Sequence, residues 1–99
     1  MKLALFARLE AKPGKEQEVA DFLRQGVALA NQEATTLSWF ALRIGPSTFA
    51  VFDTFADEAG RQRHLHGPIA QALMSQAPML FAAPPAIEAL EVLGAKLPA

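Results

Sequence analysis

Three segments that read as β-strands carry apolar side chains on both of their faces. Successive side chains of a strand point to opposite faces of a sheet, so a sheet with one face in water should alternate between apolar and polar residues. This alternation fails in segments 2–9, 37–44 and 49–55. Adjacent apolar residues that must face opposite ways are Leu5 with Phe6, Trp39 with Phe40, and Val51 with Phe52. Helices can cover only one face of such a sheet, so the other face must be buried against something else.

The remaining elements complete the order β-α-β-β-α-β. Apolar residues at helical spacing predict a helix from residue 15 to about residue 31, and residues 45–48 predict a hairpin turn. Asp57 is a suitable N-cap for a short helix over residues 58–66. A second apolar stripe begins after Gly67 and Pro68, and Pro78 is expected to kink or end that helix. With a last strand over residues 87–93, the order predicts one ferredoxin-like α+β domain over residues 1–99, an antiparallel sheet with helices on one face.

The apolar content of the chain points to a partner molecule. Apolar residues make up 52% of the 99 residues, and a domain of this size buries only about two-thirds of its surface when it folds alone. No run approaches the roughly 18–20 apolar residues that span a bilayer, and Arg8 and Glu10 interrupt the N-terminal run before a signal peptide could form. A second copy of the chain, packed sheet against sheet, is the simplest partner.

Charge and cysteine content exclude several classes of function. Nine basic and ten acidic residues are spread along the chain, for a net charge of −1, whereas nucleic-acid binding needs a clustered basic face. Cysteine is absent, which excludes disulfides, thiolate metal sites and cysteine nucleophiles. The lack of cysteine and of a signal peptide favours a cytoplasmic protein.

Two stretches of the chain are similar to the antibiotic biosynthesis monooxygenase family. The first is the strand–hairpin–strand segment 37–49, LSWFALRIGPSTF. The second is segment 52–59, FDTFADEA, followed by HLHGP at residues 64–68. The resemblance covers essentially the whole chain, and its most specific element is the histidine on the short helix after the third strand, which His64 matches. It implies a dimeric α+β barrel.

The resemblance also implies a type of chemistry. Better-known members of the family oxidise electron-rich aromatics such as quinols and anthrones with O2, without flavin, haem or metal. A deprotonated phenol or enol is reducing enough to react with O2 itself, so the protein supplies a dry aromatic pocket, orientation and a proton acceptor. The expected ligand is therefore a small aromatic or hydrophobic molecule, and no cofactor is expected.

His64 is the candidate catalytic residue, as the proton acceptor. On a helix it shares a face with Gly60 and Arg61, and its unperturbed pKa of about 6.5 suits a base near neutral pH. The alternative is a structural histidine that bonds a strand carbonyl. His66 lies about 200° around the helix from His64, so the two cannot share a metal ion while helical, and no metal site is expected.

Four further residues are candidates for substrate binding. Trp39, the only tryptophan of the chain, could stack on a flat substrate or simply pack in the core or the dimer interface. Arg43 could orient an anionic oxygen or form a salt bridge with Asp53 on the hairpin partner strand. Phe52 and Phe55 would supply apolar lining.

Other residues of the chain can be compared with what a haem-degrading relative would have. Glu33, in the loop after the first helix, is expected to be solvated, and Asn31 is expected to cap that helix. A haem-degrading relative would be expected to have an asparagine on the first strand and a tryptophan shortly before the histidine. Phe6 and Arg8 lie on that strand and Phe55 precedes His64, which argues against haem degradation. The chain also has no tyrosine, the phenol that some family pockets use.

Two main hypotheses follow from the sequence. The first is a cofactor-independent oxygenase that acts on a quinol-like or polycyclic aromatic with His64 as the base. The second is a non-enzymatic homodimer that binds a small hydrophobic metabolite. An isomerase or dehydratase that uses the same histidine is a third possibility.

Overall fold

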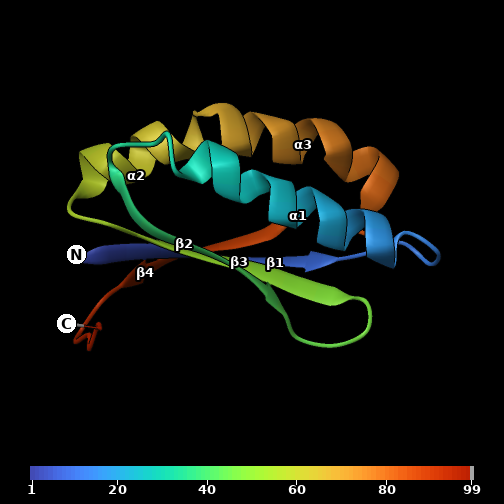
Figure 1. The fold of residues 1–99 in the computed structure, drawn as a ribbon, viewed down its shortest axis with the longest axis horizontal. Coiled ribbons are helices and arrows are strands. Elements are labelled where there is room, and N and C mark those ends of the chain that lie inside the picture. Colours follow the sequence, from blue (N-terminus) through green and yellow to red (C-terminus); the bar gives the residue numbers. More distant parts are fainter. Residues whose placement is uncertain (99) are drawn as a thin grey trace.

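The computed structural model describes residues 1–98 and confirms the predicted α+β fold (Figure 1). In chain order its elements are β1 (Leu3–Glu10), α1 (Glu16–Ala30), β2 (Thr36–Arg43), β3 (Thr48–Phe55), α2 (Glu58–Leu65), α3 (Pro68–Leu80) and β4 (Ala86–Glu91). The four strands form one antiparallel sheet in the order β2-β3-β1-β4. This is the ferredoxin-like β-α-β-β-α-β arrangement, with its second helical region broken in two.

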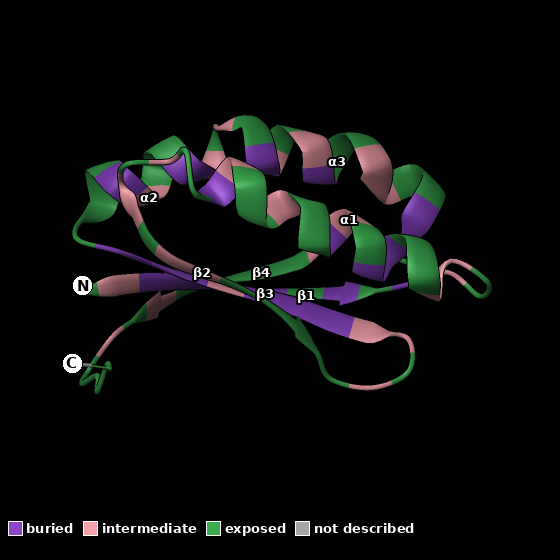
Figure 2. Ribbon diagram, in the orientation of Figure 1, coloured by how far each residue is buried: buried purple, intermediate pink, exposed green. Residues whose placement is uncertain are grey.

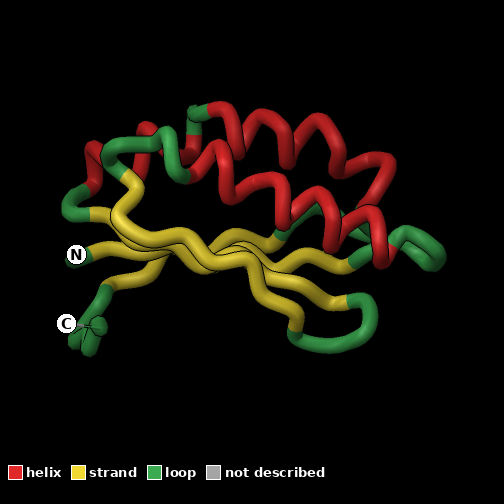
Figure 3. The backbone as a smooth tube through the Cα atoms, in the orientation of Figure 1, coloured by secondary structure: helices red, strands yellow, loops and turns green. Residues whose placement is uncertain are grey.

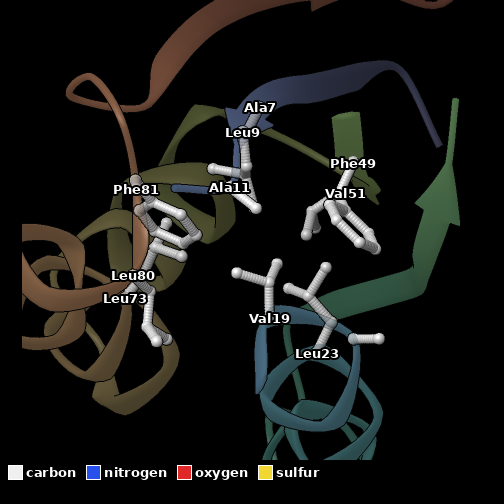
Figure 4. Close-up of a cluster of buried hydrophobic side chains, with 11 residues drawn as sticks. Ala7, Leu9, Ala11, Val19, Leu23, Phe49, Val51, Leu73, Leu80 and Phe81 are labelled. Atoms are coloured by element: carbon white, nitrogen blue, oxygen red, sulfur yellow. The ribbon is translucent and has the colours of Figure 1, made fainter. Parts of the chain in front are cut away.

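The three helices all lie on one face of the sheet, and no helix of the described residues covers the other face (Figures 1 and 3). Odd-numbered residues of β1 point toward the helices, where Leu5, Ala7 and Leu9 are buried. Ala7 and Leu9 join side chains of α1, β3 and α3 in the core drawn in Figure 4. This core comprises Ala7, Leu9, Ala11, Val19, Ala20, Leu23, Phe49, Val51, Leu73, Leu80 and Phe81.

Large apolar side chains of β1, β2 and β3 lie on the uncovered face of the sheet, with the charged Arg8 and Glu88 on the same face. Phe40 is 51% exposed and Leu42 is 42% exposed, and the Phe40 ring stacks on Phe52 with 6.4 Å between ring centroids. Phe6 lies opposite Phe52 in the register between β1 and β3. Figure 2 shows that exposed and half-buried positions continue along β2 and β4, the two edge strands. The expectation that helices leave one apolar sheet face uncovered is therefore confirmed.

The strand register fixes which side chains meet beneath the helices. Trp39 on β2 and Leu5 on β1 both lie directly opposite Asp53 of β3. Since opposed residues on neighbouring strands point to the same face, these three side chains lie side by side under the helices. Phe40, the neighbour of Trp39, faces the other way, as the alternation of strand residues requires.

The helix boundaries differ from the prediction at one proline. Pro78 was expected to kink or end helix α3, and it does not end it, because α3 continues through Pro78 to Leu80. Proline lacks an N–H and leaves a carbonyl one turn earlier without its helical donor, a small loss so near the helix end. The carbonyl of Pro78 itself accepts a hydrogen bond of 2.6 Å from Lys12 Nζ. Within residues 1–98, no helix combines the length and apolar character needed to cross a membrane.

Candidate functional site

A cavity of about 240 Å³ lies between the helices and the sheet. Its walls are largely apolar and come from β1, α1, β2, β3, α2, α3 and β4. They include Leu5, Phe22, Leu29, Trp39, Val51, Leu65, Ile69, Leu73 and Ile87. Two of the lining residues are ionisable, Asp53 and His64, and both are buried. An engineered cavity of about 150 Å³ with similar walls holds benzene, so this cavity has room for one or two fused rings.

His64 lies between two carboxylates that reach it from different elements. Its Nε2 is 2.8 Å from Asp53 Oδ2 on β3, and its Nδ1 is 2.7 Å from Glu33 Oε1 in the loop between α1 and β2. Thr36 Oγ1 donates a hydrogen bond of 2.7 Å to the same Glu33 oxygen. The three residues form a hydrogen-bonded chain, Glu33–His64–Asp53, that runs from this loop to the sheet.

Two local features of α2 place His64 at this position. The Asp57 side chain caps the helix by accepting a 2.9 Å hydrogen bond from the Gly60 backbone N–H. Gly60 is buried, and a Cβ atom there would lie 3.2 Å from the backbone oxygen of Thr35. Glycine therefore lets the helix approach the loop that carries Glu33. The Phe55 ring lies 5.4 Å from the imidazole and supports it from the sheet.

The two short contacts of His64 restrict its protonation state. A neutral imidazole has one N–H and one lone pair, whereas an imidazolium has two N–H donors. Both carboxylates can accept a hydrogen bond only from an imidazolium, or else one carboxyl group must itself be protonated. In either state neither ring nitrogen of His64 has a free lone pair.

The pKa of His64 is raised above its ordinary value of 6.5. Burial by itself lowers this pKa, because it disfavours the charged ring. The hydrogen bonds and negative charges of Asp53 and Glu33 act in the opposite direction and outweigh the burial. The folded protein therefore favours the imidazolium.

This shift predicts that the protein loses stability as the pH rises above about 6.5. A raised pKa means that the folded state binds the proton more tightly than the unfolded state. The resulting stabilisation is complete below the unfolded-state pKa and is lost as the pH rises through the folded-state pKa. Urea unfolding at a series of pH values should show the free energy of unfolding falling in this window. His64→Gln should remove this component and the exposed His66→Gln should retain it; equal pH profiles for the wild type and His64→Gln would contradict the assignment.

Trp39 forms a wall of the cavity beneath α1. A Cβ atom at Gly26 would lie 2.9 Å from Cη2 and 3.2 Å from Cζ2 of the indole. Glycine at this position of α1 therefore lets the tryptophan occupy the space between helix and sheet. Helix α1 and the sheet therefore approach each other closely at Gly26.

Gly26→Ala is expected to displace the indole and change the shape of the cavity. Alanine favours a helix by about 1 kcal/mol over glycine, while overpacking costs about 1–3 kcal/mol, so we expect a small net loss of stability. The emission spectrum of Trp39, the only tryptophan, should shift. Gly94→Ala is the matched control, since a Cβ atom there meets nothing within 4 Å. Identical emission spectra for the two variants would contradict the contact.

Three of the four predicted substrate-binding residues do not line the cavity. Arg43 and Phe52 lie away from it, and Phe55 packs against the His64 ring without lining the cavity. The hairpin register places Arg43 opposite Phe49, and its guanidinium lies 4.9 Å from the centroid of that ring. The salt bridge between Arg43 and Asp53 is therefore a wrong expectation, because Asp53 lies opposite Trp39 and bonds His64. Phe52 lies on the uncovered face of the sheet, since it alternates with the inward-facing Asp53.

The structure brings Trp39, Phe55 and His64 together, and it adds two carboxylates that the sequence did not indicate as site residues. The expectation that Glu33 is solvated is wrong, because its side chain is only 14% exposed and bonds His64. No spacing rule connects it to a histidine 31 residues away. The position of Asp53 in its strand could have indicated its role, since an acid at an inward-facing strand position must be paired when it is buried.

The second histidine is separate from this chain of hydrogen bonds. His66 is exposed, and its Nδ1 lies 2.8 Å from the backbone oxygen of Gln62 in its own helix. The part of the chain that the structure describes contains no group of three or more histidine, cysteine or acidic side chains positioned to hold a metal ion.

Comparison with solved structures identifies a relative of high similarity. The Nitrosomonas europaea protein NE2512, of unknown function, is 64% identical, with a TM-score of 0.96, and the match covers 99% of this chain and 95% of that chain. No family model matches the chain, and no curated protein matches it.

More distant structures share the fold. A Nitrosomonas europaea protein assigned to the antibiotic biosynthesis monooxygenases has a TM-score of 0.82 at 12% identity, and the match covers 93% of this chain and 99% of that one. Another antibiotic biosynthesis monooxygenase has a TM-score of 0.80 at 17% identity, with coverage of 93% and 99%. At these identities the likeness concerns the fold.

Proposed function

Since this chain belongs to the family of NE2512 and has the fold of antibiotic biosynthesis monooxygenases, we propose that it is a cofactor-independent monooxygenase. Its substrate is a small quinol-like aromatic, which it oxidises with O2 in the cytoplasm. One observation carries the proposal: an apolar cavity of about 240 Å³ has two members of the buried Glu33–His64–Asp53 chain, His64 and Asp53, in its wall.

The chemistry needs little besides what these residues supply. A hydroxyaromatic that loses its proton becomes electron-rich enough to reduce O2, and it provides both electrons that convert the second oxygen atom to water. The protein contributes a dry site, orientation of the ring and acceptance of the proton. His64 contributes to proton acceptance by its hydrogen bonds to the Glu33 and Asp53 carboxylates.

The cavity also limits the substrate. Its volume favours one or two fused rings over a three-ring anthrone. In this proposal the Trp39 indole is the wall on which the ring packs, and Phe55 holds the imidazole in place. Arg43 and Phe52 lie outside the cavity and take no part in binding.

Oxygen uptake tests the proposal. Protein freed of metal by chelation should accelerate O2 consumption with 1,4-naphthoquinol more than with anthrone. The rate should fall by about 10²–10⁴-fold in His64→Gln, the range that general acid–base catalysis contributes, and His66→Gln should keep the wild-type rate. Equal rates for the two variants, or no protein-dependent uptake, would rule the proposal out.

The second candidate function is binding without catalysis. The observation that favours it is the engagement of both ring nitrogens of His64, which is also what a purely structural histidine shows. A non-enzymatic binder of a small hydrophobic metabolite predicts quenching of Trp39 fluorescence by ligand with no product formed.

We also propose that the protein is a homodimer joined through the uncovered sheet faces. Phe40, Leu42 and the Phe40–Phe52 pair form an apolar surface on that face. Such a surface is costly to leave in water, and twofold symmetry pairs it with an identical surface.

A further inference from the structure

Among residues 1–98, three buried side-chain atoms have no hydrogen-bond partner: Trp39 Nε1, Asp53 Oδ1 and Glu33 Oε2. Folded proteins contain few such atoms, and each one costs about 1–3 kcal/mol. Two of the three belong to residues that line the cavity, Trp39 and Asp53. These two residues lie directly opposite each other on β2 and β3, where Cβ atoms are about 4.5–5.5 Å apart.

The two atoms have complementary chemistry. The indole N–H can only donate a hydrogen bond, and a carboxylate oxygen can only accept one. A hydroxyl group satisfies both at once, because its oxygen accepts from the indole while its hydrogen is donated to the carboxylate. A carbonyl or an ether could satisfy Trp39 alone, and an ammonium group could satisfy Asp53 alone.

We propose that the cavity binds its ligand by a hydroxyl group held between Trp39 Nε1 and Asp53 Oδ1, and that Asp53 is the residue that takes the hydroxyl proton. The inference rests on the proposed function for the identity of the site, and it specifies the ligand as a hydroxylated aromatic. It also assigns the acceptor atom, since neither nitrogen of His64 has a free lone pair in this arrangement.

The proton transfer balances within these residues. The O–H bond of the ligand breaks, a bond forms between the proton and Asp53 Oδ1, and the electron pair stays on the ligand oxygen. Trp39 Nε1–H then donates to that oxyanion. Asp53 Oδ2 continues to accept from His64 Nε2–H, while Nδ1–H donates to Glu33. His64 and Glu33 are thus positioning residues, which hold the carboxylate and balance its charge.

Ligand binding without oxygen tests this inference separately from catalysis. Isothermal titration calorimetry under nitrogen would compare 2-naphthol with 2-fluoronaphthalene, which has a similar shape and no proton to donate. A hydrogen bond to a charged group is worth about 1.5–3 kcal/mol, so 2-naphthol should bind about 10- to 150-fold more tightly. Equal affinities for the two ligands in the wild-type protein would overturn the inference, and this comparison needs no variant.

Variants of Asp53 and Trp39 then test whether these two residues hold the hydroxyl group. Asp53→Asn keeps a carbonyl oxygen for His64 and places an amide donor where Oδ1 accepted, so the preference for 2-naphthol should disappear. Asp21→Asn, which makes the same charge change at an exposed site on α1, should keep it. Trp39→Phe should reduce the preference by removing the indole donor. Full preference in a folded Asp53→Asn protein would overturn the role of Asp53.

The outcomes separate this inference from the proposed function. If 2-naphthol is preferred but no quinol is oxidised, the inference stands and the oxygenase proposal fails. If quinols are oxidised but 2-naphthol and 2-fluoronaphthalene bind equally, the oxygenase proposal stands and the inference of a hydroxyl group held between Trp39 and Asp53 fails.

Discussion

Replacing His64 with alanine is expected to lower the free energy of unfolding by about 3–5 kcal/mol, the usual cost of removing one partner from a buried ion pair. The substitution leaves Asp53, which is 2% exposed, and Glu33 with no donor at the positions that His64 occupied. Two carboxylates would then be left without a positive charge between them. Because a domain of this size is stable by about 5–15 kcal/mol in total, the variant should be strongly destabilised.

Urea unfolding of the variants measures this effect. His66→Ala, in the same turn of helix, removes an exposed imidazole and should change stability by less than about 0.5 kcal/mol. His64→Gln has one amide donor and should recover part of the loss, which also makes it the better variant for activity measurements. A His64→Ala protein as stable as His66→Ala would show that the Glu33–His64–Asp53 chain contributes nothing to the fold.

Phe40→Glu is expected to convert the proposed dimer into a monomer. It places two symmetry-related carboxylates beside Phe52 in the proposed interface, where each would be buried among apolar side chains. Burial of an unpaired charge costs several kcal/mol, which corresponds to at least about a hundred-fold weaker association. Since Phe40 is 51% exposed in the single chain, the monomer itself should stay folded.

Analytical ultracentrifugation over a range of micromolar concentrations measures this prediction. The matched control is Met79→Glu, because Met79 is an exposed apolar residue, 62% accessible, on the helical side of the domain. We expect a monomer for Phe40→Glu and a dimer for both Met79→Glu and the wild type. A monomeric wild-type protein would contradict the sheet-face dimer, and so would a dimer that survives Phe40→Glu.

The fold could be predicted because its signals are local. Strand alternation, turn residues and helical spacing are properties of short segments, and they were sufficient to predict the order β-α-β-β-α-β. They also separated Trp39 from Phe40, since neighbouring strand residues must face opposite ways. The structure places the tryptophan beneath α1 and the phenylalanine on the uncovered face.

The site was only partly predictable because its contacts are not local. Glu33 reaches His64 across 31 residues, and only the path of the chain after α1 brings them together. The placement of Arg43 depended on the exact hairpin register, which sets it against Phe49 and away from Asp53. Strand alternation turns Asp53 toward the helices, but its unpartnered oxygen depends on contacts between distant segments.

Isotope labelling is the most direct test of the central claim, that the cavity and its buried Glu33–His64–Asp53 chain support cofactor-free monooxygenation. Metal-chelated wild-type protein would turn over 1,4-naphthoquinol under ¹⁸O2, with a parallel reaction in H2¹⁸O to measure exchange with solvent, and the product would be analysed by mass spectrometry. We expect a protein-dependent product that carries one oxygen atom from O2, and we expect this product to be lost in Asp53→Asn but not in Asp21→Asn. A product without label from O2, or equal labelling in both variants, would contradict the central claim.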